Sequence, residues 1–399
     1  MKVLFVNVTY SLGGAAKIAQ AIFRQMGGVF FYGNGRSIWR DPEDGSVPDV
    51  FRVGSVLTKL LNKYLFKVLG RDIFTHRKLL WRDQVLRADV IHLHAIHSYF
   101  VNFSFLFKLL ATHKKKIIWT FHDLWALTGR CALPAPCLEY ETGCKKCTLT
   151  TNYPECMCDS FSSNYEEKKR LVMSIPKENM VVVVPTRWME EKVRNSYYSK
   201  FSIRIVRNGI DLDQFSFKQS SISKKRLRVL IVANCFGVQK GLADFLEITK
   251  RLPEVDFFVV GILPSEINDN NVFSIGYISS REKLVEEYHR ADFMLFLSVD
   301  DNYPTVILEA LACGTPVISY KGLGNKEIFE GLDYPYLVED GDTDAVVGIL
   351  ETFSVGKVDV SAYEQISRQG RAQMERNNDL RKMVLAYKGI YEELCKNEK

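Results

Sequence analysis

Long apolar runs are missing from this sequence of 399 residues. No stretch reaches the roughly 18 consecutive apolar residues that a membrane-spanning helix needs, so we expect no transmembrane segment. The N-terminal stretch MKVLFVNVTY is typical of a first β-strand rather than of a signal peptide. We therefore expect a cytoplasmic protein, which could also work at the inner face of the plasma membrane.

A large excess of charge of one sign is also missing. The net charge is +6, and charged residues make up 25% of the chain, as in ordinary globular proteins. Such a modest excess is consistent with an anionic partner such as nucleotide, lipid head groups or nucleic acid, and it decides nothing by itself. The length suits two domains of ordinary size.

The most informative segment is DDNYPTVILEALACG, residues 300–314. An apolar stretch at 293–297 precedes it and another at 316–320 follows it, so the pattern predicts strand, helix, strand. Such a parallel βαβ unit binds its ligands beyond the carboxyl ends of the strands. Four residues suit the helix ends: Asp301 and Asn302 as caps, Pro304 as first helical residue, and Gly314 as left-handed C-terminal residue.

Two carboxylates of this segment, Asp301 and Glu309, stand eight positions apart. Unpaired N–H groups at a helix start can hold a pyrophosphate. A carboxylate beside phosphate repels it, so a sensible role is to accept hydrogen bonds from hydroxyls, as in a sugar nucleotide. The alternative is a capped core helix in which Glu309 is a solvated charge.

The segment DNYPTVILEALACGTPVIS resembles the acidic-x7-acidic segment of the retaining GT-B glycosyltransferases of family four, with Asp301 at the usual place of the first glutamate. The resemblance implies an α/β fold of the GT-B class, two Rossmann-like domains facing a central cleft. It implies a donor site made of Gly13, Gly14, Asn234, Lys240, Asp301, Tyr303, Pro304, Thr305, Val306 and Glu309.

Lys240 follows the apolar stretch 228–233, where a strand turns into a helix. A cation there can neutralise a diphosphate leaving group as negative charge develops in the transition state. The family usually adds an arginine at the position of Asn234, so this chain has one cation fewer. The alternative for Lys240 is a solvent-exposed lysine near a helix start.

Histidines end two predicted strands of the N-terminal half, residues 89–94 and 116–121. The run Thr-Phe-His-Asp-Leu-Trp at 120–125 resembles the family's histidine loop. This resemblance implies that His122 faces the donor sugar. Asp123 could orient that ring or position an acceptor hydroxyl. A lone histidine is more often structural, and we hold that interpretation for His92 and His97.

Four of the nine cysteines lie close together in the sequence, at Cys131, Cys137, Cys144 and Cys147. Four thiolates complete a tetrahedral zinc site, and disulfides are disfavoured in a cytoplasmic enzyme. We therefore predict a structural zinc in the segment 131–158, with free thiols, or an iron–sulfur or redox role, as alternatives. A closed four-cysteine site keeps no open position for catalysis.

The remaining stretch 33–82 is predicted to be irregular, apart from an amphipathic run at 57–69 that carries Lys59, Lys63 and Lys67. This run could face a membrane surface or an acceptor. The alternative is a helix packed on the domain.

A narrower resemblance rests on His-Asp-Leu-Trp-x3-Gly-Arg-Cys, which is similar to glycosyltransferases of the colanic-acid and exopolysaccharide type. The Asn-Gly-Ile-Asp run at 208–211 resembles the turn that closes the family's first domain. We expect an acceptor-side domain at 1–210, a nucleotide-sugar domain at 211–375, and a C-terminal helix at 376–399 that crosses back to the first domain.

The resemblance implies a reaction that moves a hexose from a UDP- or GDP-linked sugar to a lipid-linked saccharide in capsule or exopolysaccharide biosynthesis, with retention and without a catalytic metal. No enzymic nucleophile is evident, which favours front-face attack. Peripheral membrane contact is allowed and no nucleic-acid partner is expected. The alternatives are a nucleotide-sugar 2-epimerase and an inactive scaffold with a zinc module. The catalytic residues on this view are His122, Asp123, Lys240 and Asp301.

Overall fold

The computed structural model describes residues 1–35, 49–134, 137–147, 153–154, 156–157, 161–220, 222, 226–263, 267, 269–356 and 359–396. The chain forms two compact units. The first unit combines Met1–Val206 with Val384–Lys399, and the second unit is Arg207–Met383. The division before Arg207 lies close to the expected boundary at 210, and residues 376–383 belong to the second unit.

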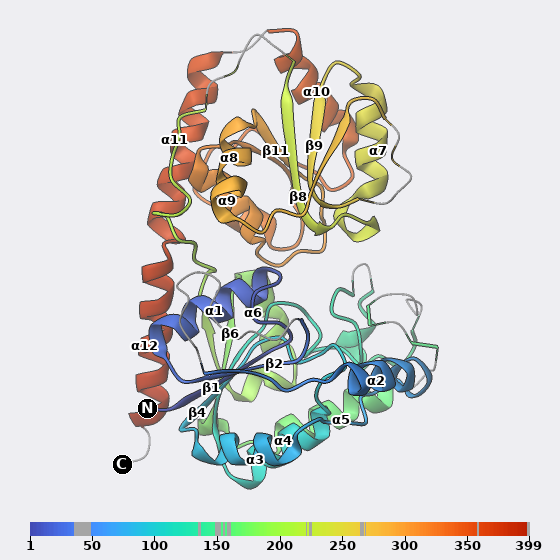
Figure 1. Ribbon diagram of the computed structural model, residues 1–399, viewed down its shortest axis with the longest axis vertical. Helices are drawn as coiled ribbons and strands as arrows, with labels where there is room; N and C mark the ends of the chain where they lie inside the picture. Colours follow the sequence, from blue (N-terminus) through green and yellow to red (C-terminus); the bar gives the residue numbers. More distant parts are fainter. Residues whose placement is uncertain are drawn as a thin grey trace. The chain divides into compact units, whose positions relative to one another are not determined.

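The first unit is a parallel sheet of seven strands in the order β3-β2-β1-β4-β5-β6-β7, with helices packed on it (Figure 1). Its strands are β1 (Val3–Asn7), β2 (Val29–Tyr32), β3 (Val50–Arg52), β4 (Val90–Leu93), β5 (Lys116–Thr120), β6 (Met180–Val184) and β7 (Ser202–Ile205). Its α-helices are α1 (Gly14–Met26), α2 (Val56–Leu69), α3 (Lys78–Arg87), α4 (Phe103–Thr112), α5 (Phe161–Met173) and α6 (Arg187–Arg194), and its 3₁₀ helices are η1 (Glu139–Thr142), η2 (Lys177–Asn179) and η3 (Tyr197–Lys200).

The second unit is a parallel sheet of six strands in the order β10-β9-β8-β11-β12-β13. Its strands are β8 (Arg228–Cys235), β9 (Asp256–Ile262), β10 (Val272–Gly276), β11 (Phe293–Phe296), β12 (Val317–Tyr320) and β13 (Leu337–Val338). Its helices are α7 (Leu242–Arg251), α8 (Arg281–Arg290), α9 (Thr305–Cys313), α10 (Thr343–Ser354), α11 (Val360–Asn377) and the start of α12 (Leu380–Lys396), with η4 (Val238–Lys240) and η5 (Asn325–Phe329).

Both sheets form because their central strands are apolar on both faces. Every residue of β1, β5 and β6 is buried, as is every residue of β11 and β12. A strand of this kind needs cover on both sides, which the crossover helices of a parallel sheet provide. The prediction of two Rossmann-like α/β domains is therefore confirmed.

The prediction that 33–82 is irregular outside 57–69 is wrong. Within the described part of that stretch, β3 adds an edge strand to the sheet and α3 packs beside it. The ring of Trp81 on α3 is buried, and it meets the ring of Phe31 edge-on with centroids 5.0 Å apart. This aromatic contact joins residues that are far apart in sequence, so local patterning did not indicate it.

The end of α12 belongs to the first unit, where two of its tyrosines are bonded to strand residues. The Tyr387 hydroxyl lies 3.0 Å from the Thr120 hydroxyl, and the Tyr391 hydroxyl lies 2.6 Å from Nδ1 of His92. Both tyrosines are buried. These bonds fix the end of α12 against strands β4 and β5 of the first sheet.

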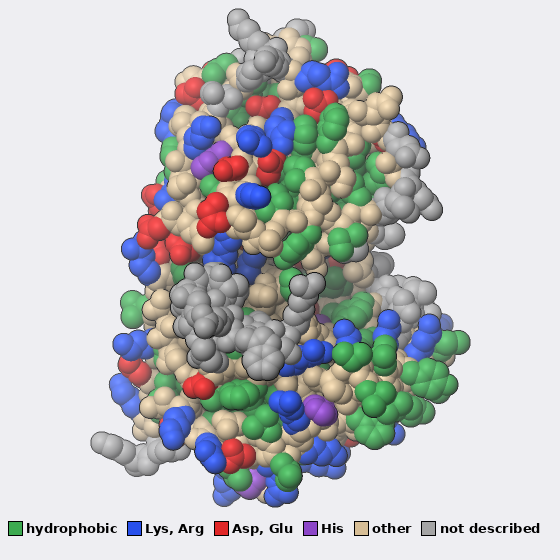
Figure 2. All heavy atoms as spheres, viewed as in Figure 1, with side chains coloured by type: hydrophobic (Ala, Val, Ile, Leu, Met, Phe, Trp, Pro, Cys, Tyr) green, Lys and Arg blue, Asp and Glu red, His purple; other side chains and the backbone are tan. Residues whose placement is uncertain are grey.

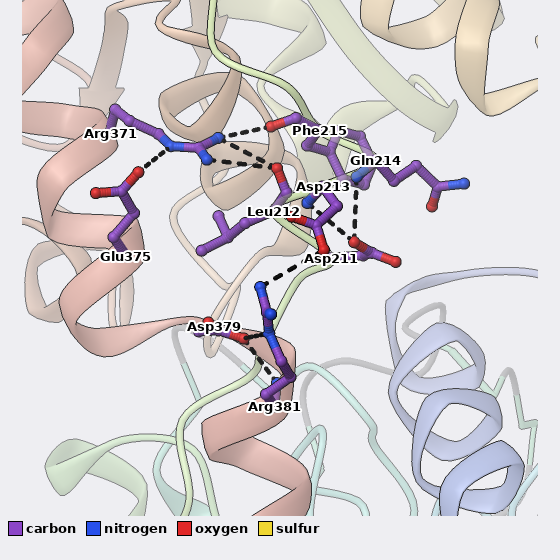
Figure 3. Close-up of polar contacts among 9 residues, drawn as sticks. All are labelled: Asp211, Leu212, Asp213, Gln214, Phe215, Arg371, Glu375, Asp379 and Arg381. Carbon is purple, nitrogen blue, oxygen red and sulfur yellow. Dashed lines mark hydrogen bonds and ion pairs between the residues drawn. The ribbon is translucent and has the colours of Figure 1, made fainter.

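The turn at 208–211 was expected to close the first domain, but it lies in the second unit. The Asp211 carboxylate accepts hydrogen bonds from the N–H groups of Asp213 and Gln214 (Figure 3). Arg371 of α11 donates to the carbonyls of Leu212, 3.4 Å away, and Phe215, 2.8 Å away, while its Nε pairs with Glu375 at 2.7 Å (Figure 3). The segment 211–215 is thus held on α11 by main-chain acceptors.

Among the described residues, no helix combines the length and the apolar character that crossing a bilayer requires.

Candidate active site

In the second unit, Lys240 and Asp301 form an ion pair. Nζ of Lys240 donates to Oδ2 of Asp301 over 2.6 Å, and both side chains are partly exposed. Lys240 follows β8 and Asp301 follows β11, and these strands are neighbours in the sheet. The fold thus brings together two predicted donor-site residues that are 61 positions apart in sequence.

Gly241 allows Lys240 to take this position. Its φ is +77°, a left-handed value that side chains disfavour, and a Cβ there would lie 2.5 Å from the Cβ of Leu297. Beside it, the Ser298 hydroxyl donates to the carbonyl of Gln239 over 3.1 Å. A small pocket lies here, lined by the ends of β8 and β11 and by Lys240.

The start of α9 differs from the prediction. The helix begins at Thr305, Pro304 occupies the N-cap position with an extended ψ of 123°, and no side chain caps the helix. Asp301 pairs with Lys240 and therefore does not cap it. At the other end, Gly314 has a left-handed φ of 89°, as predicted. The uncapped start leaves backbone N–H groups of the first turn without intrahelical partners.

The loop that carries Asp301 is supported by residues 322–325. The Gly324 N–H donates to the carbonyl of Asp301 over 3.2 Å, and a Cβ at Gly324 would collide with the carbonyl of Asn302. The buried amide of Asn325 donates to the carbonyl of Ser298 over 2.9 Å. These contacts of residues 322–325 hold the Asp301 loop in place.

Glu309 lies inside the second unit, with 1% of its surface exposed. Its Oε2 accepts a hydrogen bond from the hydroxyl of Tyr288 over 3.0 Å. Burial, reinforced by the Glu309 charge, raises the pKa of Tyr288 well above its ordinary value, so that hydroxyl remains a donor. The interpretation of Glu309 as a solvated charge is wrong. Its role toward a ribose stays a prediction.

The other predicted donor residues divide by exposure. Tyr303 and Thr305 are buried, and Tyr303 accepts hydrogen bonds from Asn208 at its carbonyl and from Asn378 at its hydroxyl. Val306 is partly buried, and Asn234, at the end of β8, is exposed. Of these four residues, Asn234 is therefore the most accessible to solvent.

In the first unit, the carboxyl ends of β4 and β5 bring four histidines and one aspartate together. We call His92, His94, His97, His122 and Asp123 the histidine pocket; most of them line a narrow cavity. Nδ1 of His94 lies 2.9 Å from Nε2 of His122. Nε2 of His97 lies 2.9 Å from Oδ2 of Asp123. The predicted site residues His122 and Asp123 thus share one pocket with His92 and His97, which the sequence assigned to structure.

Burial keeps three imidazoles of this pocket neutral, those of His92, His94 and His122. It lowers the pKa of His122 from 6.5 to about 4 and holds the pKa values of His92 and His94 well below 6.5, assisted by neighbouring imidazoles. Burial alone would raise the pKa of Asp123, but the charge and hydrogen bond of His97 and the N–H of Trp125 outweigh it, so that pKa is lowered. At neutral pH the pocket therefore holds the Asp123 carboxylate together with the neutral rings of His92, His94 and His122.

His97 is the site residue that the sequence missed. Beyond its bond to Asp123, its Nδ1 lies 2.8 Å from the hydroxyl of Ser98, which also contacts the hydroxyl of Tyr153. Ser98 and Tyr99 have left-handed φ values of 79° and 70°, which cost free energy in residues with side chains. Strained backbone of this kind gathers at functional sites. By contrast, both ring nitrogens of His92 are bonded inside the first unit, as a structural role requires.

Gly13 and Gly14 lie where β1 passes into α1. Gly13 is the N-cap residue with a φ of 87°, and a Cβ there would meet no atom within 4 Å. Gly14 is the first residue of the helix. The loop is therefore open on its outer side, and glycine is required at Gly13 for its conformation rather than for space.

The cysteine segment is partly described. Cys131 is buried, whereas Cys137, Cys144 and Cys147 are partly exposed, and the Gly129 N–H donates to Sγ of Cys144 over 3.1 Å. Burial raises the pKa of Cys131 to about 11. Within the residues that the structure describes, no three or more histidine, cysteine, aspartate or glutamate side chains are grouped to hold a metal ion. The structural zinc stays a prediction, and residues 148–152, 155 and 158–160 lie outside the described ranges.

Comparison with known families gives a match within the second unit. Residues 213–373 match the family model of the glycosyl transferases group 1. The second unit is therefore similar to a group 1 glycosyl transferase domain. The match includes Lys240, Asp301 and Glu309, and of the predicted donor residues only Gly13 and Gly14 lie outside it.

Two curated relatives extend the likeness beyond the matched domain. WcaC of Escherichia coli strain K12, assigned to colanic acid biosynthesis as a glycosyl transferase, is 26% identical over 348 residues, covering 83% of this chain and 85% of WcaC. The amylovoran biosynthesis glycosyltransferase AmsK of Erwinia amylovora is 26% identical and covers 49% of this chain and 52% of AmsK. The resemblance to glycosyltransferases of the colanic-acid type is therefore confirmed.

Solved structures confirm the fold class, GT-B. HepE of Anabaena, solved in complex with UDP, has a TM-score of 0.67 at 15% identity and covers 98% of this chain and 100% of its own. Sucrose-phosphate synthase of Thermosynechococcus elongatus has a TM-score of 0.67 at 15% identity and covers 100% of both chains. At such low identity the likeness establishes the architecture of two Rossmann-like domains and no more.

Proposed function

We propose that this chain is a glycosyltransferase that moves a hexose from a UDP- or GDP-linked sugar to a lipid-linked saccharide in exopolysaccharide or capsule biosynthesis. The proposal includes retention at the anomeric carbon and catalysis without a metal. It also places the enzyme in the cytoplasm, at the inner face of the plasma membrane. The relatives WcaC and AmsK, named for the biosynthesis of colanic acid and of amylovoran, support the polysaccharide assignment.

The observation that carries the proposal is the Lys240–Asp301 pair beside the start of α9. An ammonium and a helix N-terminus both attract a diphosphate, and a carboxylate next to them suits sugar hydroxyls. The two requirements of a nucleotide-sugar donor thus meet at the carboxyl ends of two neighbouring parallel strands. The fold neighbour HepE, solved with UDP and with UDP-glucose, supports a donor of this class.

In the proposed reaction the bond between the anomeric carbon and the diphosphate oxygen breaks, and a bond from that carbon to the acceptor oxygen forms on the same face. The acceptor proton passes to the departing diphosphate oxygen. Lys240 and the N–H groups at the start of α9 stabilise the charge that develops on that oxygen. Asp301 accepts hydrogen bonds from the sugar hydroxyls, and Glu309 holds the ribose.

We assign the acceptor to the histidine pocket of the first unit. Asp123 remains ionised at neutral pH, since His97 and the Trp125 N–H stabilise its charge. A carboxylate can orient an incoming hydroxyl by accepting its hydrogen bond, and the neutral ring of His122 offers either a donor or an acceptor. Positioning of this kind raises the rate without proton transfer to the enzyme, because the acceptor proton passes to the departing diphosphate oxygen.

Calorimetric titration of the full chain with UDP, GDP and their hexose derivatives tests the donor site. Lys240→Ala is expected to weaken binding of the correct nucleotide sugar by about tenfold to a hundredfold, the usual cost of one charge-assisted hydrogen bond. The matched control is Lys321→Ala, which removes another lysine of the second unit that pairs with a carboxylate, Glu339. Equal effects of the two variants, or no binding at all, would refute the donor site. Donor turnover without acceptor would indicate an epimerase instead.

A further inference from the structure

The helix α2 presents its apolar side to solvent, which is the reverse of an ordinary surface helix. Its buried side chains are Asn62 and Phe66, one turn apart. On the opposite side, Leu57, Leu60 and Tyr64 are 76%, 60% and 66% exposed. Two more exposed apolar residues, Leu61 and Val68, extend this side of the helix. Figure 2 shows hydrophobic side chains gathered where α2 lies in Figure 1.

Basic residues flank this apolar side. Lys59, Lys63 and Lys67 recur every fourth residue and so form one row along the helix. The helix, VLTKLLNKYLFKVL, contains no acidic residue, and the Arg71 that follows it pairs with Glu167 over 3.7 Å. An apolar strip with a row of lysines along one flank is complementary to a surface that is apolar inside and negative at its boundary.

We propose that α2 docks this protein on an anionic lipid membrane, with Leu57, Leu60 and Tyr64 entering the acyl boundary and the lysine row contacting lipid phosphates. The inference rests on the proposed lipid-linked acceptor and names the surface on which that acceptor is met. The 14 residues of α2 suit a helix that lies in the plane of the membrane surface rather than one that spans the membrane.

The buried side of α2 connects the docking surface to the histidine pocket. The Asn62 amide donates to the carbonyl of Tyr99 over 3.0 Å and to that of Phe74 over 2.8 Å, and its Oδ1 accepts from the Phe74 N–H. The ring of Phe66 packs edge-on against the ring of Tyr99. Tyr99 follows His97 and Ser98 directly, so a docked α2 holds the loop of the histidine pocket at the membrane surface.

Co-sedimentation of the full chain with vesicles tests the docking. Phosphatidylcholine vesicles containing phosphatidylglycerol are expected to bind the protein, and vesicles of phosphatidylcholine alone are expected to bind it at least tenfold more weakly. Lys59→Gln with Lys63→Gln should weaken binding by about 25-fold, at about fivefold for each lysine. Leu57→Asn with Leu60→Asn should weaken it by about a hundredfold, since two leucines no longer leave water.

Two matched variants control for charge and apolarity elsewhere on the chain. Lys108→Gln with Lys250→Gln removes two exposed lysines, and Leu86→Asn with Leu385→Asn removes two exposed leucines, all outside α2. Both controls should bind vesicles like the wild type. Equal loss in controls and α2 variants, or equal binding to neutral and anionic vesicles, would overturn the proposal.

A second copy of the chain is the competing occupant of this surface. Sedimentation equilibrium of the wild type distinguishes it: a dimer that Leu57→Asn with Leu60→Asn converts to a monomer would overturn membrane docking. Failure of the docking is separable from failure of the proposed function, because nucleotide-sugar binding by the second unit is measured without vesicles. Donor binding without vesicle binding would refute only the docking, and vesicle binding without donor binding would refute only the transferase.

Discussion

Acidification should destabilise the first unit through its neutral histidines. His92, His94 and His122 are buried with pKa values below the 6.5 of a free imidazole. In the unfolded chain each takes up a proton near pH 6.5, whereas the folded state resists protonation until a lower pH. Stability that is present above pH 6.5 is therefore lost as the pH falls toward the folded pKa values.

The magnitude follows from the number of protons taken up on unfolding. Each proton contributes about 1.4 kcal/mol per pH unit, so three histidines give about 4 kcal/mol per unit between roughly pH 6.5 and 4. Asp72 acts in the opposite direction, because burial raises its pKa from 3.8 to about 8 and the folded state binds its proton in this window. The net uptake of two protons predicts a loss of about 3 kcal/mol per pH unit.

Tryptophan fluorescence reports the unfolding of the first unit selectively. All five tryptophans, at positions 39, 81, 119, 125 and 188, lie before residue 206. Urea titrations between pH 7.5 and 5 would give the free energy of unfolding at each pH by linear extrapolation. A slope near zero, or stability that rises on acidification, would refute the assignment of neutral buried rings.

One variant tests the cause of the slope. His94→Leu removes one titrating ring, so the slope should fall by about 1.4 kcal/mol per pH unit whatever the substitution itself costs. His113→Leu makes the same change at the exposed residue that follows α4 and serves as the matched control variant. An unchanged slope in His94→Leu would show that other groups cause the acid sensitivity.

Two predictions concern the second unit. In thermal melts, Gly241→Ala should cost about 1–3 kcal/mol of stability, because the left-handed backbone and Leu297 exclude a side chain, and it should weaken nucleotide-sugar binding. Its control is Gly348→Ala, in a helix with open space around it, which should be neutral or slightly stabilising in the same melts. Tyr288→Phe removes a donor to buried Glu309 and should cost about 1–3 kcal/mol in circular-dichroism melts, while a nucleotide that needs Glu309 should bind more weakly in calorimetry.

The sequence predicted the fold well because the signal for it is local. A strand such as β6, with five apolar residues in succession that are all buried, can lie only at the centre of a covered sheet. The same holds for β11 and β12 on either side of α9. Gly314 was also placed correctly, since a left-handed residue at a helix end depends on its own backbone.

The sequence predicted less of the site because each partnership there joins distant residues. Asp301 suits a helix cap in isolation, but the lysine with which it pairs comes from another strand. His97 appeared structural because its partner Asp123 follows a different strand. The outward apolar side of α2 could not be known from periodicity alone, which gives the face of a helix but not the direction in which that face points.

The division of these residues between the two units makes the proposed roles separable. Lys240, Asp301 and Glu309 belong to Arg207–Met383, while His122 and Asp123 belong to the unit formed by Met1–Val206 and Val384–Lys399. Asp123→Asn should therefore slow transfer to an acceptor while leaving calorimetric donor affinity within about twofold, because the proposed donor contacts of Lys240, Asp301 and Glu309 belong to the other unit. Loss of donor affinity in Asp123→Asn equal to that in Lys240→Ala would contradict the assignment of donor and acceptor to separate units.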